Sequence, residues 1–228
     1  MDVLHNDMTF ADIQERHTGK TYKKEGMSMG RNCCITIERQ YGSGGREVAR
    51  ILSERLGIPC YGRELLAVTA ADNGISIEEL KKLDEKRTGS LLHDLVLYAF
   101  RFQNYNKMQE PFDINKEVSD TIRRLARKGP CIFIGRCADF ALDGECDVLK
   151  LFIYASSIEK RKRRICEVDD IAFEKAEEEI QKRDSQRSDY YHYFTGKNWG
   201  DMENYDACLN TSVLGYEGCA DLIMKMME

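Results

Sequence analysis

A glycine-rich turn between a short apolar run and an amphipathic helix is the feature that most constrains this fold. Residues 33–37 read Cys-Cys-Ile-Thr-Ile, which suits a buried strand, and apolar residues recur at helical spacing from Val48 to Leu56. Between them, 42–45 read Gly-Ser-Gly-Gly. A loop between a strand and a helix start directs backbone amides at one point, where an anion binds. The pattern predicts a phosphate-binding loop in an α/β fold.

Glycine suits such a loop because it permits positive φ and lets the backbone approach phosphate oxygens closely. The competing interpretation is a tight turn that binds nothing, since glycine clusters recur by chance. The strand before the loop and the helix after it favour phosphate binding. The residues expected to contact phosphate are Gly42, Ser43, Gly44, Gly45 and Arg46.

The rest of the chain alternates apolar runs with helical patterns. Such alternation predicts a doubly wound α/β fold with a five-stranded parallel sheet. We expect residues 1–31 to be an extension and 32–228 to form the domain. Further strands are expected at 58–61, 131–134, 148–154 and 207–210, and helices at 63–72, 77–87, 90–107, 115–128 and from Tyr216 onward.

Composition excludes several classes of protein. Hydrophobic residues make up 42% and charged residues 32%, as in a soluble globular domain, and the net charge of -5 disfavours nucleic acid as a partner. No apolar run is long enough to span a bilayer, and no signal-peptide core is seen, so we expect a cytoplasmic protein with no membrane partner. The nine cysteines include no Cys-x-x-Cys pair, which favours reduced thiols and no metal site.

Several segments together resemble the cytidylate-kinase-like family. The segment 35–49 reads Ile-Thr-Ile-Glu-Arg-Gln-Tyr-Gly-Ser-Gly-Gly-Arg-Glu-Val-Ala, and 134–139 read Ile-Gly-Arg-Cys-Ala-Asp, like that family's Gly-Arg segment. The resemblance continues through 152–157, 183–191, 195–200 and 205–212 and covers roughly 33–225. It implies a P-loop nucleoside monophosphate kinase fold, with a helical insert at 62–128 over the acceptor site and a lid at about 183–203.

The resemblance implies ATP- and Mg²⁺-dependent phosphoryl transfer to a nucleoside monophosphate, with a cytidylate-like acceptor favoured. One departure stands out. Aligned on the family's loop, Gly45 stands where the Walker lysine belongs, and Glu47 stands at the hydroxyl residue that holds Mg²⁺. Arg46 is a candidate substitute for the lysine, although a solvated arginine at a helix start is the plain alternative. Glu47 either binds Mg²⁺ or caps the helix, and capping is favoured.

Phosphoryl transfer to a phosphate needs no general base. It needs positively charged groups beside the oxygens of the phosphoryl group that is transferred. Arg136 follows the third strand, at the carboxyl edge where α/β sheets bind ligands. Arg183 and Arg187 lie four apart and share one face of a predicted helix. Surface salt bridges and a solvated helix end are the competing interpretations. The predicted catalytic residues are Arg46, Arg136, Arg183 and Arg187.

The resemblance also implies binding residues. Arg163 or Arg164 would lie beside the nucleotide base, and the family's Asp-x-x-Arg element, which touches the acceptor, corresponds to Asp184 and Arg187. The expected acceptor-binding residues are Tyr61, Arg63, Arg136, Asp139, Asp184 and Arg187.

Two alternatives remain open at the level of sequence. One is a kinase with the same chemistry and another small acceptor, because the segment at Tyr61 and Arg63 departs from the family's motif. The other is a nucleotide-sensing protein that kept the fold and lost the catalytic lysine.

Overall fold

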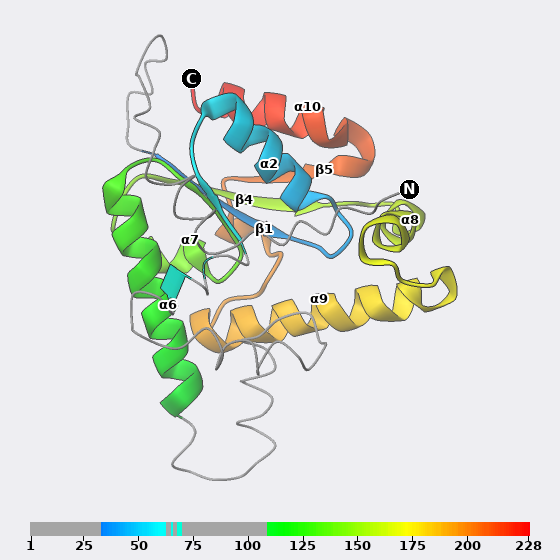
Figure 1. Ribbon diagram of the computed structural model, residues 1–228, viewed down its shortest axis with the longest axis horizontal. Coiled ribbons are helices and arrows are strands. Elements are labelled where there is room, and N and C mark those ends of the chain that lie inside the picture. Colours follow the sequence, from blue (N-terminus) through cyan, green and yellow to red (C-terminus); the bar gives the residue numbers. More distant parts are fainter. Residues whose placement is uncertain (1–32, 63–64, 66–67, 70–108) are drawn as a thin grey trace.

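The computed structural model describes residues 33–62, 65, 68, 69 and 109–228 (Figure 1). The expected extension at 1–31, the helices expected at 77–87 and 90–107, and most of the helix expected at 63–72 lie outside the described residues. None of the helices in the described ranges is long and apolar enough to cross a membrane.

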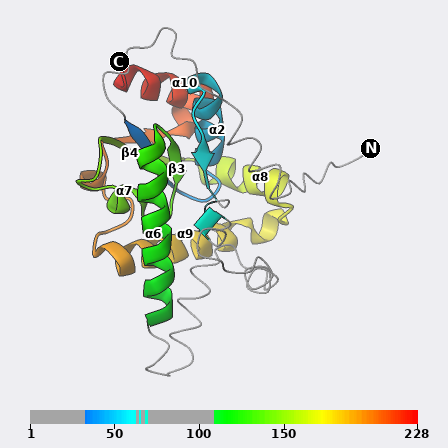
Figure 2. The same cartoon turned by 60° about the vertical axis from the view of Figure 1, so that its left-hand side comes forward.

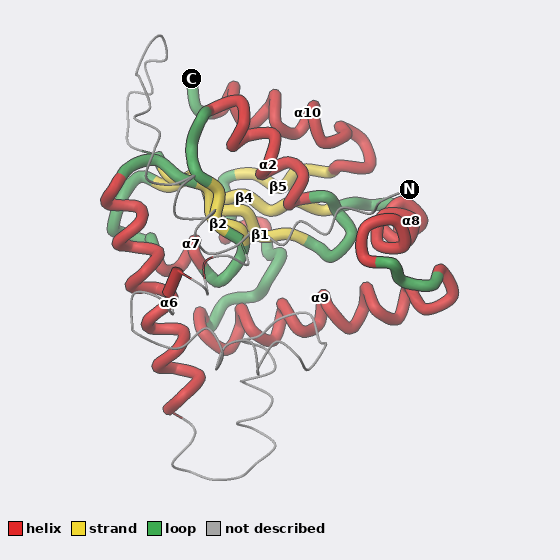
Figure 3. Tube along the Cα trace, viewed as in Figure 1, coloured by secondary structure: helices red, strands yellow, loops and turns green. Residues whose placement is uncertain are grey.

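The centre of the molecule is a five-stranded sheet whose strands all run parallel, as predicted (Figure 3). Its spatial order is β2-β3-β1-β4-β5, so β1 is flanked on both sides. In register, Ile35 of β1 stands beside Ile132 on one neighbour and Leu149 on the other. The strands are β1 (Cys34–Arg39), β2 (Cys60–Tyr61), β3 (Ile132–Ile134), β4 (Val148–Tyr154) and β5 (Ala207–Asn210).

Helices cover both faces of the sheet, which makes the fold doubly wound (Figures 1 and 2). Helices α2 (Gly45–Leu56) and α10 (Thr211–Met226) lie on one face, and α6 (Gln109–Lys128) and α7 (Ala138–Ala141) lie on the other. Two more helices pack on each other beside the loop that follows β1, and a single 3-10 turn precedes β5. These are α8 (Ile158–Asp169), α9 (Phe173–Thr195) and η2 (Met202–Asn204).

Apolar side chains on the two sheet faces form separate cores. Ile35 and Ile37 of β1 point to the α2 and α10 side, where Val48 and Leu52 of α2 are fully buried, as their helical spacing predicts. On the other face, Phe133 packs with residues of α6 and α7. Burial on both faces explains why the central strands read as continuous apolar runs.

Some boundaries differ from the sequence expectation for local reasons. Helix α10 begins at Thr211 rather than at Tyr216, because the Asn210 side chain accepts a hydrogen bond of 3.0 Å from the Ser212 amide and caps an extra turn. Gly215, with φ 69° and ψ -180°, then breaks the helical path, so the apolar period resumes only after it. The expected lid segment begins inside α9, which is continuous to Thr195.

Candidate phosphate-binding site

The loop between β1 and α2 takes a shape that only glycine allows at two positions. Gly42 and Gly44 have φ of +77° and +81°, in the left-handed region. A Cβ atom at Gly44 would lie 2.2 Å from Cε1 of Tyr216 on α10, and one at Gly42 would lie 2.9 Å from the Arg161 carbonyl oxygen on α8. Both conformation and space therefore require these glycines.

Backbone donors collect at this loop. The Ser43 amide and hydroxyl both donate to the Gln40 carbonyl, at 3.3 and 2.8 Å, so this buried serine closes the turn and does not line the cavity. The amides of Gly42, Gly44 and Gly45 have no acceptor among the described residues, and α2 has no side-chain cap. Three amides and a helix N-terminus are left for an anion.

A polar clamp fixes the loop to α8 and α9. The Tyr41 amide donates to Asp184 Oδ1 at 2.7 Å, and Arg161 Nε donates to the Tyr41 carbonyl at 2.7 Å. Arg161 and Asp184 also form an ion pair through the second carboxylate oxygen. Asp184 thus has both oxygens bound to protein and does not line the cavity.

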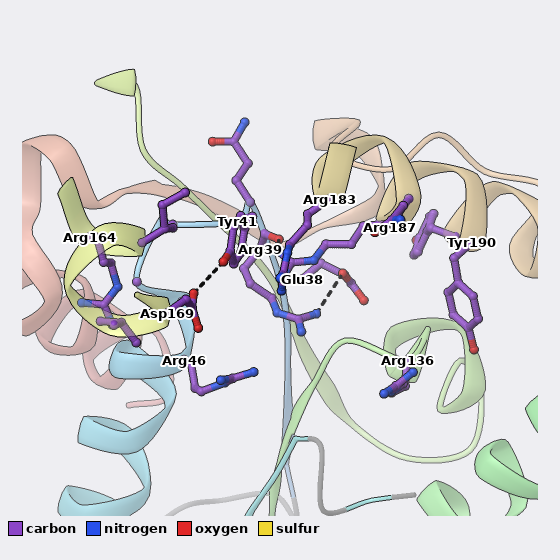
Figure 4. Close-up of a pocket in the computed structure, with 18 residues that line it drawn as sticks. Glu38, Arg39, Tyr41, Arg46, Arg136, Arg164, Asp169, Arg183, Arg187 and Tyr190 are labelled. Carbon is purple, nitrogen blue, oxygen red and sulfur yellow. Dashed lines mark hydrogen bonds and ion pairs between the residues drawn. The ribbon is translucent and has the colours of Figure 1, made fainter. Parts of the chain in front are cut away.

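A cavity of about 150 Å³ opens in front of the loop (Figure 4). Among the described residues, its lining contains six arginines and two carboxylates, Glu38 and Asp169. Such an excess of positive charge suits a polyanionic ligand. The arginines are Arg39, Arg46, Arg136, Arg164, Arg183 and Arg187.

The four arginines predicted to be catalytic all line this cavity. Arg46, in the first turn of α2, is exposed, and Arg136 comes from the loop after β3 (Figure 4). Arg136 has φ 64°, a conformation costly for a residue with a side chain. Arg183 and Arg187 come from α9, with guanidinium carbons 4.5 and 5.6 Å from the centre of the Tyr41 ring.

Arg187 is held against the end of β1. Its Nη1 donates to the Arg39 carbonyl at 2.7 Å. Burial, followed by the positive charge of Arg39, lowers the pKa of Arg187 to about 9. Cations crowded together with too little counter-charge show this direction of shift, and an anion in the cavity relieves the crowding.

The structure separates the two arginines between which the sequence does not choose. Arg164 lines the cavity, and its Nη1 donates to the hydroxyl oxygen of Tyr216 at 3.0 Å while its guanidinium lies 4.8 Å from that ring. Arg163 is exposed on α8 and does not line the cavity.

Three of the six residues expected to bind the acceptor, Tyr61, Asp139 and Asp184, do not line this cavity. Tyr61 is 7% exposed and stacks on Phe133 in the core, with ring centres 5.6 Å apart. Asp139 is 4% exposed and accepts a 2.6 Å hydrogen bond from the Tyr191 hydroxyl, and burial raises the pKa of Asp139. Neither lines the cavity. Arg63 lies outside the described residues.

Two cavity residues at the end of β1 are absent from the residues selected on sequence. Glu38 is buried, accepts a hydrogen bond of 3.0 Å from Trp199 Nε1, and lies 3.8 Å from Arg39 Nη1. Burial raises the pKa of Glu38, and the charge of Arg39 partly opposes that shift. The sequence does contain a signal for Arg39 as a cavity residue, because this cation stands shortly before a glycine turn that lacks the usual lysine.

The fold and the glycine loop place this protein in the class of α/β proteins that have a P-loop-type turn after the first strand. The model of the cytidylate kinase-like family matches residues 34–213, so the chain belongs to this family, as its motifs predict.

Distant relatives are named cytidylate kinase, and one solved structure has a similar fold. The chain is 28% identical to a cytidylate kinase of Methanopyrus kandleri over 187 residues, covering 78% of this chain and 84% of the relative. It is 28% identical to a cytidylate kinase of Sulfurisphaera tokodaii over 197 residues, covering 85% and 92%. An uncharacterized protein from Eubacterium ventriosum has a similar fold, with a TM-score of 0.64 at 24% identity, over 86% of this chain and 98% of that one.

Proposed function

We propose that this protein transfers the γ-phosphoryl group of ATP to a nucleoside monophosphate, with cytidylate as the favoured acceptor. The observation that carries the proposal is the lining of the cavity, which among the described residues holds six arginines and two carboxylates beside the glycine loop. Family membership and relatives named cytidylate kinase support the choice of reaction and of acceptor.

The proposed reaction asks only for positioning and positive charge. A phosphate oxygen of the acceptor bonds to the γ-phosphorus of ATP while the bond to the β,γ-bridging oxygen breaks, which leaves ADP and a nucleoside diphosphate. The loop amides and Arg46 hold oxygens of the donor. The opposite wall binds the acceptor phosphate and the phosphoryl group that is transferred, through Arg136, Arg183 and Arg187.

The residues present also fit a nucleotide that arrives with Mg²⁺, an ion that would offset part of the phosphate charge. Of the two carboxylates among the described lining residues, Asp169 would hold the ion, because Glu38 pairs with Arg39 and accepts a hydrogen bond from Trp199. Glu47, at the position of the usual hydroxyl ligand, accepts hydrogen bonds of 3.1 and 2.6 Å from Arg50 instead.

A second candidate function is nucleotide sensing without turnover. It is favoured by Gly45 at the position of the Walker lysine, because losing such an electrostatic group costs about 3 kcal/mol of transition-state stabilisation. Transfer to another small phosphorylated or hydroxylated acceptor is the third, since Tyr61 is buried in the core rather than at the cavity.

One panel of measurements separates these functions. Thermal unfolding is followed with ATP and Mg²⁺ and with each nucleoside monophosphate, and a coupled assay records ADP release. Saturating ligand at one hundred times its Kd stabilises the fold by about 2.7 kcal/mol, whether or not chemistry follows. Cytidine, which lacks the phosphate, is the matched control and is expected to give no shift.

Each outcome assigns one function. A shift and ADP release with cytidylate support the proposed kinase. ADP release only with another acceptor supports the third candidate. A shift with ATP and no ADP release with any acceptor supports sensing.

A further inference from the structure

Two positions of the glycine loop have exchanged their usual residue types. A Walker loop, Gly-x-x-x-x-Gly-Lys, has its first glycine six residues before the lysine. In this chain Arg39 stands at the first glycine, Gly44 keeps the second, and Gly45 stands at the lysine. The cation and the glycine are therefore both present, but each stands at the position where the Walker loop has the other.

Arg39 fills the space that a side chain at position 45 would need. A Cβ atom at Gly45 would lie 2.6 Å from Cβ and 3.1 Å from Cγ of Arg39. Gly45 begins α2 without a left-handed φ, so the backbone itself does not demand glycine there. Space is what requires glycine, and a lysine at 45 and an arginine at 39 exclude each other.

The head of Arg39 reaches across the loop to the end of β3. A Cβ atom at Gly135 would lie 2.1 Å from Arg39 Nη1, so a second glycine accommodates the guanidinium. This head group lines the cavity, and its charge is among the causes that lower the pKa of Arg187. Arg39 thus ends in the cluster of arginines that faces the loop.

We propose that Arg39 supplies, from the end of β1, the phosphate-binding charge that a Walker lysine supplies from the start of the following helix. The inference rests on the proposed function and names Arg39, rather than Arg46, as the substitute. Its guanidinium donates hydrogen bonds to terminal phosphate oxygens of the nucleotide, leaving Glu38 as it does so. A guanidinium makes two parallel bonds to phosphate and lysine makes point contacts, so R39K is not an equivalent.

The competing explanation is that Arg39 only neutralises the buried Glu38, 3.8 Å away. A charge partner of that kind is dispensable once the carboxylate is removed. The variant R39A in an E38Q background therefore separates the two roles, because glutamine still accepts the hydrogen bond from Trp199.

The test measures binding first and turnover second. Isothermal titration with Mg²⁺-ATP and with inorganic tripolyphosphate is run on the full chain and on R39A, R39K and E38Q/R39A. We expect R39A to weaken both ligands at least tenfold, R39K to recover only part, and E38Q/R39A to remain as weak as R39A. The control R55A removes an arginine of α2 that pairs with Glu217 and Asp221 away from the cavity, and it should bind like the parent.

Exchanging the residue types at positions 39 and 45 tests whether the two side chains exclude each other. G45K, with Arg39 still present, should lose binding or stability because the two side chains collide. R39G/G45K restores the Walker arrangement and should bind ATP at least tenfold more tightly than R39G.

The outcomes for Arg39 and for the kinase proposal are distinguishable. A parent that binds ATP and turns over, with R39A equal to it in both, overturns the role of Arg39 and leaves the kinase proposal standing. Full recovery of binding in E38Q/R39A also overturns it. A parent that binds neither ATP nor tripolyphosphate overturns both proposals.

Discussion

The amide of Tyr41 and the carboxylate of Asp184 join the glycine loop to α9 through a hydrogen bond of 2.7 Å between residues 143 apart in sequence. The same carboxylate pairs with Arg161, whose side chain is 8% exposed. The loop that faces the cavity is therefore shaped by a helix far along the chain.

We expect D184A to lower the free energy of unfolding by about 3 kcal/mol, because it leaves Arg161 buried without its partner. D184N keeps an acceptor for the Tyr41 amide and should cost less. Urea unfolding monitored by circular dichroism measures both. D143A, which removes a 57% exposed carboxylate paired with Lys150, is the control and should stay within about 1 kcal/mol of the parent. Equal effects of D184A and D143A would contradict the clamp.

Arg136 offers a pair of variants that separates strain from chemistry. Both R136A and R136G remove the guanidinium and should lower turnover by about a hundredfold or more. Only glycine accepts the φ of 64° without strain, so R136G should be more stable than R136A by about 1 kcal/mol. Steady-state kinetics and urea unfolding of the two proteins check this, and parental turnover in both would remove Arg136 from the mechanism.

Arg187 should show the opposite balance of stability and activity. Burial, followed by the nearby charge of Arg39, lowers its pKa to about 9, so the ligand-free fold holds this charge at a cost. R187M is therefore expected to unfold at the parental temperature or above it, while turnover falls about a hundredfold or more. A marked drop in unfolding temperature with unchanged turnover would show that Arg187 is structural.

Glu38 gives the stability a pH dependence of known sign. Its pKa is raised in the folded protein by burial, so between its ordinary value near 4.5 and the raised value the folded state binds more protons than the unfolded state. Stability must fall as pH rises through that window. E38Q should flatten this part of the curve of unfolding free energy against pH. E54Q, at a 63% exposed position on α2, should leave the curve as in the parent, and an identical curve for E38Q would refute the assignment.

The sheet and its covering helices follow from local patterns in the sequence. The run 148–154 predicts β4 over its full length, because all its residues except Lys150 are apolar, as is typical of a strand inside a parallel sheet. Helix α10 begins before its predicted start because Gly215 interrupts its period, and one side-chain cap upstream decides where it begins. The spacing of apolar residues does not predict such a cap, because the cap depends on one hydrogen bond of a polar side chain.

The sequence predicts the arginines that line the cavity better than it predicts the other residues of the site. Arginines near strand ends and on one helix face could be selected, since parallel strands bring those ends together. The roles of Asp184 and Tyr61 depend on contacts across the fold, with Tyr41 and Phe133, which no spacing rule contains. Arg39 was within reach of sequence reasoning, because its place in the loop is visible once the missing lysine is noticed.

The hydrogen bond from Trp199 to Glu38 places the only tryptophan of the chain against the residue that pairs with Arg39. Intrinsic fluorescence at this one indole therefore reports on the cavity without any label, and a phosphate that draws Arg39 away from Glu38 changes the field on the ring. The molecule contains its own optical probe, which lets titrations and stopped-flow records follow the cavity in the unmodified protein.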